Sequence, residues 1–173
     1  MVSNGPNSQS YNFTHMFDIQ DDRGTFPLRV ANTNSLLDII RTNPDFSKFN
    51  YILKLSRLED LFNNIQSNFT IFIPSDKALN QQFDETIFIN MDQNTAVHLI
   101  KISMLDDRIN GEILKDSPSA YYMTKDNANR ILISNYNYKT YINNSIRIIK
   151  MDVLAINGVI HITDGIISSL FTV

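Results

Sequence analysis

Two apolar segments that end in turn-forming residues constrain the fold of this chain more than any other feature. The first, residues 69–79, reads Phe-Thr-Ile-Phe-Ile-Pro-Ser-Asp-Lys-Ala-Leu. Its alternation from Phe69 puts apolar side chains on both faces, which predicts a central strand that Pro74 ends. Ser75 stands where it would cap a following helix, and Asp76 falls in that helix's first turn, where the helix dipole favours a carboxylate. The segment therefore predicts a buried strand that runs directly into a helix.

The second segment, residues 157–165, reads Asn-Gly-Val-Ile-His-Ile-Thr-Asp-Gly and predicts a strand between two turns. Asn157 and Gly158 suit a turn or bulge that needs a positive φ angle. Alternation puts His161 on the same face as the preceding valine and the isoleucines on the other face. Asp164 and Gly165 end the strand.

Helical periodicity lies mostly before the first segment and short strands mostly after it. Helices are predicted at 33–40, from Asn43-Pro44 through the apolar stripe Phe46, Phe49 and Leu53, at 57–63, and at 92–105. Strands are predicted at 120–125, 130–134, 138–142, 145–153 and 158–163. Because helices come first and strands later, the pattern favours an α+β domain over alternating β and α units.

Composition narrows the function classes. The 173 residues fit one domain, and an apolar content of 43% supports a real core. A net charge of −3 without any run of Lys and Arg argues against nucleic acid as the main partner. The absence of cysteine excludes disulfides and thiolate chemistry. No apolar run is long enough to span a membrane, and the first residues do not resemble a secretory signal.

Residues 1–30 are predicted to form an N-terminal extension to a domain at 31–173. A polar stretch is followed by an apolar cluster, which either packs on its own domain or docks on a neighbouring subunit. A second candidate for partner contact is Tyr121-Tyr122-Met123, since tyrosine is enriched in interfaces. Tyrosine is also a good strand residue, so that group and the series Tyr136, Tyr138 and Tyr141 remain divided between interface and sheet surface. The candidate partner-binding residues are Tyr11, Phe13, Met16, Phe17, Ile19, Tyr121 and Tyr122.

Reactive residue patterns are missing from the sequence. His161 lacks a nucleophile or companion ligands nearby, so we interpret it as a hydrogen-bonded structural imidazole. Asp106-Asp107 lacks the spacing of a calcium loop and is interpreted as a solvated helix end. We expect no catalytic residue, no metal and no cofactor. The glycosylation sequons at Asn12, Asn68 and Asn143 are interpreted as accidental in an Asn-rich chain.

The two motifs together resemble those of the fasciclin domain family over about residues 33–171. The first motif corresponds to Phe69 through Leu79, with Pro74 and Ser75 at its centre. The second corresponds to Asp152 in one strand, followed by Asn157, Gly158, His161, Asp164 and Gly165. The resemblance implies a wedge with a β-sandwich-like core flanked by helices, and roles in adhesion and protein–protein contact. Relatives commonly carry a Tyr-His pair where this chain has Ile102 and Ser103, which puts integrin-type contact in doubt.

The leading hypothesis is a non-enzymatic protein-interaction module that serves as a structural component of a large assembly. Abundant Asn and Ile suggest AT-rich coding, as in many large viruses, so a minor capsid or cement protein located in the virion or an intracellular assembly is the concrete form. The alternatives are a secreted or cell-surface adhesion protein and a carrier of a small apolar ligand.

Overall fold

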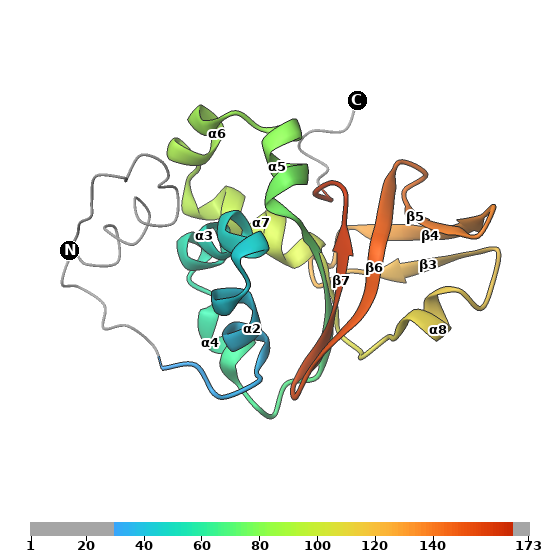
Figure 1. Ribbon diagram of the computed structural model, residues 1–173, viewed down its shortest axis with the longest axis horizontal. Helices are drawn as coiled ribbons and strands as arrows, with labels where there is room; N and C mark the ends of the chain where they lie inside the picture. The colour runs from blue at the N-terminus through green and yellow to red at the C-terminus, as the bar shows by residue number, and fades with distance from the viewer. Residues whose placement is uncertain (1–29, 168–173) are drawn as a thin grey trace.

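The computed structural model describes residues 30–167, in which all helices but one short helix gather on one side of a long twisted sheet (Figure 1). The helical elements are α2 (Leu36–Thr42), η2 (Pro44–Phe46), α3 (Ser47–Ser56), α4 (Glu59–Asn63), α5 (Asp76–Gln82), α6 (Glu85–Ile89), α7 (Gln93–Ile102) and α8 (Gly111–Leu114). The strands are β1 (Phe69–Pro74), β2 (Met104–Leu105), β3 (Ser119–Met123), β4 (Arg130–Tyr136), β5 (Lys139–Ile142), β6 (Ile146–Ala155) and β7 (Gly158–Thr163).

Within the described residues, the strands form one seven-stranded sheet in the order β2-β1-β7-β6-β5-β4-β3. The two motif strands, β1 and β7, lie side by side and pair in parallel, whereas the other pairs are antiparallel. Beyond the far end of β3, the amide of Lys125 donates to the carbonyl of Met104, the first residue of β2, at 2.9 Å. The two edges of the sheet therefore approach each other at that point, which confirms the predicted α+β fold with a sandwich-like core.

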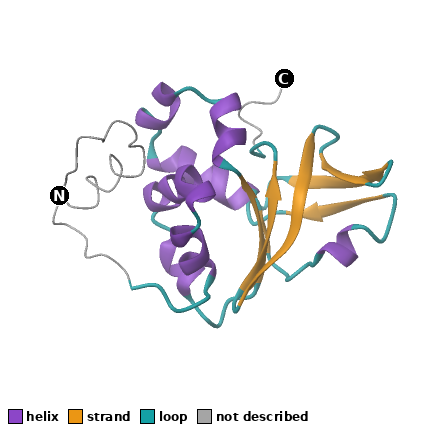
Figure 2. Ribbon diagram, in the orientation of Figure 1, coloured by secondary structure: helices purple, strands orange, loops and turns teal. Residues whose placement is uncertain are grey.

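Two apolar clusters fill the spaces on either side of the central strands. Helices α2 to α7 pack on one face of β1 and β7 (Figure 2), where Phe46, Phe49, Ile71 and Ile160 are fully buried. The other face of β1 meets the inner face of β4 and β5. The residues of that second cluster are Phe72, Ile102, Leu105, Leu114, Ile131, Ile133, Ile142, Ile148 and Ile167. Because β1 is covered on both faces, its six residues are all buried, as the sequence pattern predicts.

The strand-to-helix motif has the predicted local structure and also a long-range role. The Ser75 hydroxyl accepts from the amide of Ala78 at 3.2 Å and caps α5. Asp76, in the first turn of α5, accepts from the amide of Lys48 at 2.8 Å and from the hydroxyl of Ser47. The N-terminus of α3 has no side-chain cap from its own preceding residue, so Asp76 supplies that cap from another helix.

The helix predicted at 92–105 is shorter than its apolar pattern suggests. It ends at Ile102, and Met104 begins strand β2 instead of extending the helical stripe. Its buried residues are Ala96, Leu99, Ile100 and Ile102. Val97, which the predicted stripe included, is only half-buried. Asp106-Asp107 consequently follows a strand and is not a helix end. A two-residue strand contributes too little periodicity to be separated from a preceding helix by sequence pattern alone.

The prediction that Gly158 is needed for a turn with a positive φ angle is wrong. Neither Asn157 nor Gly158 has a positive φ angle. A Cβ atom on Gly158 would instead lie 2.4 Å from the carbonyl oxygen of Phe69 and 2.7 Å from a methyl group of Leu36. The glycine is needed because β1 and α2 approach the backbone closely, a long-range condition that no local turn signal reveals.

Candidate interaction surface

His161 is completely buried between the helix-free face of β7 and the chain before α8. Its Nδ1 accepts from the amide of Asp152 at 3.2 Å, so this nitrogen carries no proton. Nε2 therefore carries the proton and donates to the carbonyl of Ile109 at 2.8 Å. The ring also lies 5.6 Å from that of Phe72. Both nitrogens are occupied by backbone groups, which leaves neither available to act as a catalytic base.

The titration of His161 should be measurable in the stability of the domain. Burial lowers the pKa of His161, opposed in part by the Ile109 hydrogen bond and the Asp152 charge. Below the ordinary histidine pKa of about 6.5, this histidine is protonated in the unfolded chain but stays neutral in the folded protein. The free energy of unfolding therefore falls as the pH falls. We expect the stability advantage of the natural protein over His161→Gln to shrink between neutral pH and pH values below that pKa. Urea unfolding of both proteins across this range tests it, and a constant difference would contradict the assignment.

The other motif residues each hold neighbouring backbone in place. The Asp152 carboxylate accepts from the amide of Gly111 at 2.8 Å, and that of Asp164 accepts from the amide of Arg147 at 2.8 Å. Asn157 is fully buried, and its amide group bonds three backbone groups from two helices and a loop. Among the described residues, no three His, Asp or Glu side chains gather at a place that could hold a metal ion.

The outer face of strands β3, β4 and β5, which we call the tyrosine face, is the most distinctive exposed surface. The strand pairing places on it Tyr121, Met123, Arg130, Leu132, Tyr136, Lys139 and Tyr141. Tyr121 is 60% exposed and Tyr136 is 76% exposed. Tyr122 points to the opposite face, where it packs half-buried against the second apolar cluster. The structure therefore separates the two adjacent tyrosines that the sequence proposes together for partner contact.

The tyrosine face is also basic. Arg130 lies over the Tyr121 ring, with its guanidinium carbon 4.1 Å from the ring centroid, a stacked cation–π arrangement. Lys139 pairs across from Tyr136 at the far end of β4, and β3, β4 and β5 contain no Asp or Glu. The sequence signal that would have indicated the face is the set of tyrosines in these strands together with a cation at the start of β4 and of β5 and no carboxylate.

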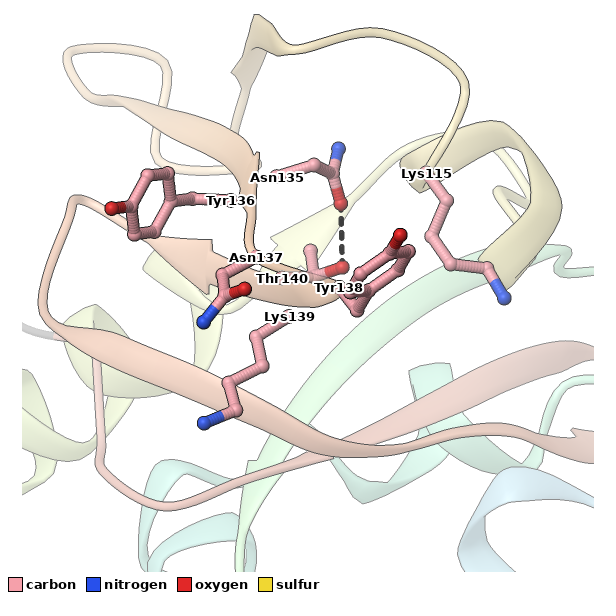
Figure 3. Close-up of a pocket in the computed structure, with 7 residues that line it drawn as sticks. All are labelled: Lys115, Asn135, Tyr136, Asn137, Tyr138, Lys139 and Thr140. Carbon is pink, nitrogen blue, oxygen red and sulfur yellow. Dashed lines mark hydrogen bonds between the residues drawn. The ribbon is translucent and has the colours of Figure 1, made fainter.

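A pocket of about 420 Å³ adjoins the tyrosine face at the hairpin between β4 and β5 (Figure 3). Its base is the pair Asn135 and Thr140, which are joined by a 2.6 Å hydrogen bond. Figure 3 shows the Tyr138 ring and Lys115 on one side, with Tyr136 turned away from them. Asn137 and Lys139 complete the lining. Tyr138 lies in the turn and not in a strand as predicted, with a φ angle of 63°.

The remaining predicted residues are not among those that define the tyrosine face or line the pocket. The candidates Tyr11, Phe13, Met16, Phe17 and Ile19 fall outside the described residues, as does the Asn12 sequon. Asn68 and Asn143 are both exposed. Ile102 and Ser103 are buried in this fold. No helix in the range 30–167 has the length and apolar content needed to cross a bilayer.

Comparisons with known proteins agree with the architecture. No curated protein matches the chain. Among solved structures, the chain resembles a FAS1 domain pair from the insect cell adhesion molecule Fasciclin I, with a TM-score of 0.67 and 20% identity. The match covers 79% of this chain and 51% of that one, so this chain spans about half the length of the structure it resembles. The family model for the Fasciclin domain matches residues 44–169. Since that match covers more than half of the sequence, the chain belongs to the fasciclin domain family.

Proposed function

We propose that this protein is a non-enzymatic protein-interaction module that contacts its partner through the tyrosine face. Fasciclin domains are protein-interaction or adhesion modules and typically lack enzymatic activity. The observation that carries the proposal is the concentration of exposed tyrosine, Met123 and stacked Arg130 on one helix-free sheet face. Tyrosine, methionine and arginine are the residue types enriched in interfaces relative to the remaining surface.

The energetics of the face suit binding. Tyrosine provides a large contact area while only two side-chain torsions must be fixed, and its hydroxyl keeps a hydrogen-bond partner. Arg130 already lies over the Tyr121 ring, so less of its rotational freedom is lost when a partner covers it. Burying several such side chains would supply the small set of dominant contacts that interfaces usually contain.

Adhesion at a cell surface is the form of this function that the family favours, because fasciclin domains are often extracellular. The sequon at Asn143 is exposed throughout and accessible for modification in that setting, whereas in the sequon at Asn68 only the asparagine is exposed. Ile102 and Ser103 are buried, so these two side chains are not available for contact with a partner. Glycans at either sequon in native material would support the extracellular form.

Cross-linking mass spectrometry on the native source tests the contact surface. We expect links to partner proteins from Lys125 and Lys139, in the strand-rich half, to exceed those from Lys77 and Lys101 on α5 and α7. Once the partner is identified, the double variant Tyr121→Ser/Tyr136→Ser should weaken binding at least about tenfold, because central aromatic contacts dominate interfaces. Ile89→Ser, at an apolar position on α6 that is 55% exposed, is the control. Links confined to the helical half would overturn the proposal.

A component of a large assembly, including a minor capsid or cement protein, is the second form of the function. The apolar cluster around residues 11–19 favours it, because a segment of that composition can dock on an adjacent subunit. Deleting residues 1–24 should then leave the domain folded and release it from its assembly. Normal incorporation of the shortened protein would exclude this form while leaving the tyrosine face as the contact surface.

A further inference from the structure

We infer that the β4–β5 hairpin pocket receives the carboxylate side chains of an acidic segment on a partner protein, with Tyr138 as its aromatic anchor. This inference rests on the proposed function and specifies the chemistry of the partner. It follows from the backbone strain at Tyr138, from the way Lys115 is held at the pocket, and from the charge of the lining.

Tyr138 occupies a backbone conformation that its side chain disfavours. The two turn residues, Asn137 and Tyr138, both have positive φ angles, of 55° and 63°. Turns of this kind prefer Asn followed by Gly, because a bulky side chain clashes with its own backbone in the left-handed region. The next turn of the same sheet, Asn143-Asn144, has the same backbone signs and is built from asparagines. A tyrosine at this tip therefore costs stability that an asparagine would not.

The side chain of Tyr138 does not offset this strain by packing within the domain. Its exposure is 105% of the reference value, so the ring contributes no burial to the fold. Residues held in disfavoured backbone conformations concentrate at binding sites. A strained and fully exposed aromatic at a hairpin tip has its simplest explanation in contact with another molecule.

Hydrogen bonds of Asn135 hold the backbone around Lys115 at the pocket. The Asn135 amide group donates to the carbonyls of Leu114 and Ser117, at 2.9 and 2.7 Å. Its oxygen accepts from Thr140 in the paired strand. These three bonds tie the end of α8 to the base of the hairpin and so fix the backbone of Lys115 beside Tyr138 (Figure 3).

The charges and neighbouring surface determine the kind of occupant. The pocket is lined by two lysines, Lys115 and Lys139, and by no carboxylate. Figure 3 draws the ends of the two lysines on opposite sides of Tyr138, so an acidic segment would place a separate carboxylate at each lysine. Its aliphatic stems would lie on the tyrosine ring, since the negative face of an aromatic ring disfavours a carboxylate. The adjacent tyrosine face offers Met123, which is 59% exposed and suits the apolar side chains of a polypeptide, a kind of contact that a sulfated polysaccharide cannot make. We therefore assign an acidic protein segment, with a polysaccharide as the competing outcome.

Binding of the full chain to immobilised poly-L-glutamate, compared with heparin, tests this inference. We expect binding to poly-L-glutamate that weakens with added salt. Lys115→Ser/Lys139→Ser should reduce it about tenfold, the loss of two screened ion pairs. The control Lys77→Ser/Lys101→Ser removes the same charge from the helical half and should leave most of the binding. Equal losses in both double variants, or binding to heparin alone, would overturn the assignment.

Tyr138→Asn separates binding from stability. We expect it to raise the unfolding temperature by about 2–4 °C, because the backbone strain is relieved, while weakening poly-L-glutamate binding several-fold. Higher stability with unchanged binding would overturn the anchoring role. If native cross-links map to the tyrosine face while poly-L-glutamate does not bind, the proposed function stands and the acidic-partner assignment fails.

Discussion

Replacement of Asn157 by alanine should destabilise the domain by about 3–5 kcal/mol, because three buried backbone groups would lose their hydrogen bonds together. The Asn157 oxygen accepts from the amide of Leu36 at 2.8 Å, at the start of α2. Its nitrogen donates to the carbonyls of Phe62 and Asn64, at 2.9 and 3.0 Å, at the end of α4. The side chain is fully buried, so water cannot replace these bonds. Urea unfolding of the purified variant measures the loss.

The chemistry of the replacement can be separated from its position. Asn157→Asp keeps an oxygen for the Leu36 amide but removes both donors and buries a carboxylate, so it should be at least as harmful as alanine. Asn94→Ala, on the exposed surface of α7, should change stability by less than about 0.5 kcal/mol. If Asn157→Ala unfolded with a similarly small change, the amide group would not be the connection between α2, α4 and β7.

Replacement of Gly158 by alanine should cost about 3 kcal/mol or more, at the upper end for overpacking of a protein core. The added methyl group would lie 2.4 Å from the carbonyl oxygen of Phe69, which belongs to the backbone of the paired strand and cannot rotate away. Relief requires β1 and β7 to separate, which disturbs the central parallel pair of the sheet. Thermal unfolding followed by circular dichroism measures the effect.

Gly165 provides the matched control within the same motif. The atom nearest to an added Cβ there is the side-chain oxygen of Gln82 at 3.3 Å, and neither glycine has a positive φ angle. A flexible side chain can shift by a few tenths of an ångström, so Gly165→Ala should cost well under half as much. Equal costs at the two positions would mean that glycine is required by the backbone and not by close approach.

Local signals in the sequence predicted the elements that local physics controls. The Phe69–Pro74 strand and the Ser75 cap depend on periodicity and caps within a few residues, and both are present as expected. The helical segment predicted from Pro44 begins there as a 3-10 turn, and the α-helix starts at Ser47. The α+β class followed from the order of those elements. Helix α7 was predicted too long because its apolar pattern continues into Met104, which becomes a strand only through its pairing with Ile71.

The candidate site was less accessible to sequence reasoning. Tyr121 and Tyr122 are equivalent in composition, and only the packing of the β3–β5 half against β1 decides that the first faces solvent and the second the core. Lys115 and Lys139 are 24 positions apart and line the same pocket because Asn135 ties α8 to the hairpin. Such contacts join segments that are far apart in the sequence, so a local sequence pattern cannot predict them.

By itself, the sequence determined the family, the order of the longer helices and strands, and the absence of cysteine chemistry. Those properties follow from residue composition, periodicity, capping residues and two motifs in a fixed order. The tertiary structure alone decided why Gly158 must be glycine, which backbone groups Asn157 joins, and that Tyr138 lies strained and exposed in a turn. The physical reason is that burial and close approach arise between segments far apart in the chain, and they set the free energy of a side chain only after the fold has brought those segments together.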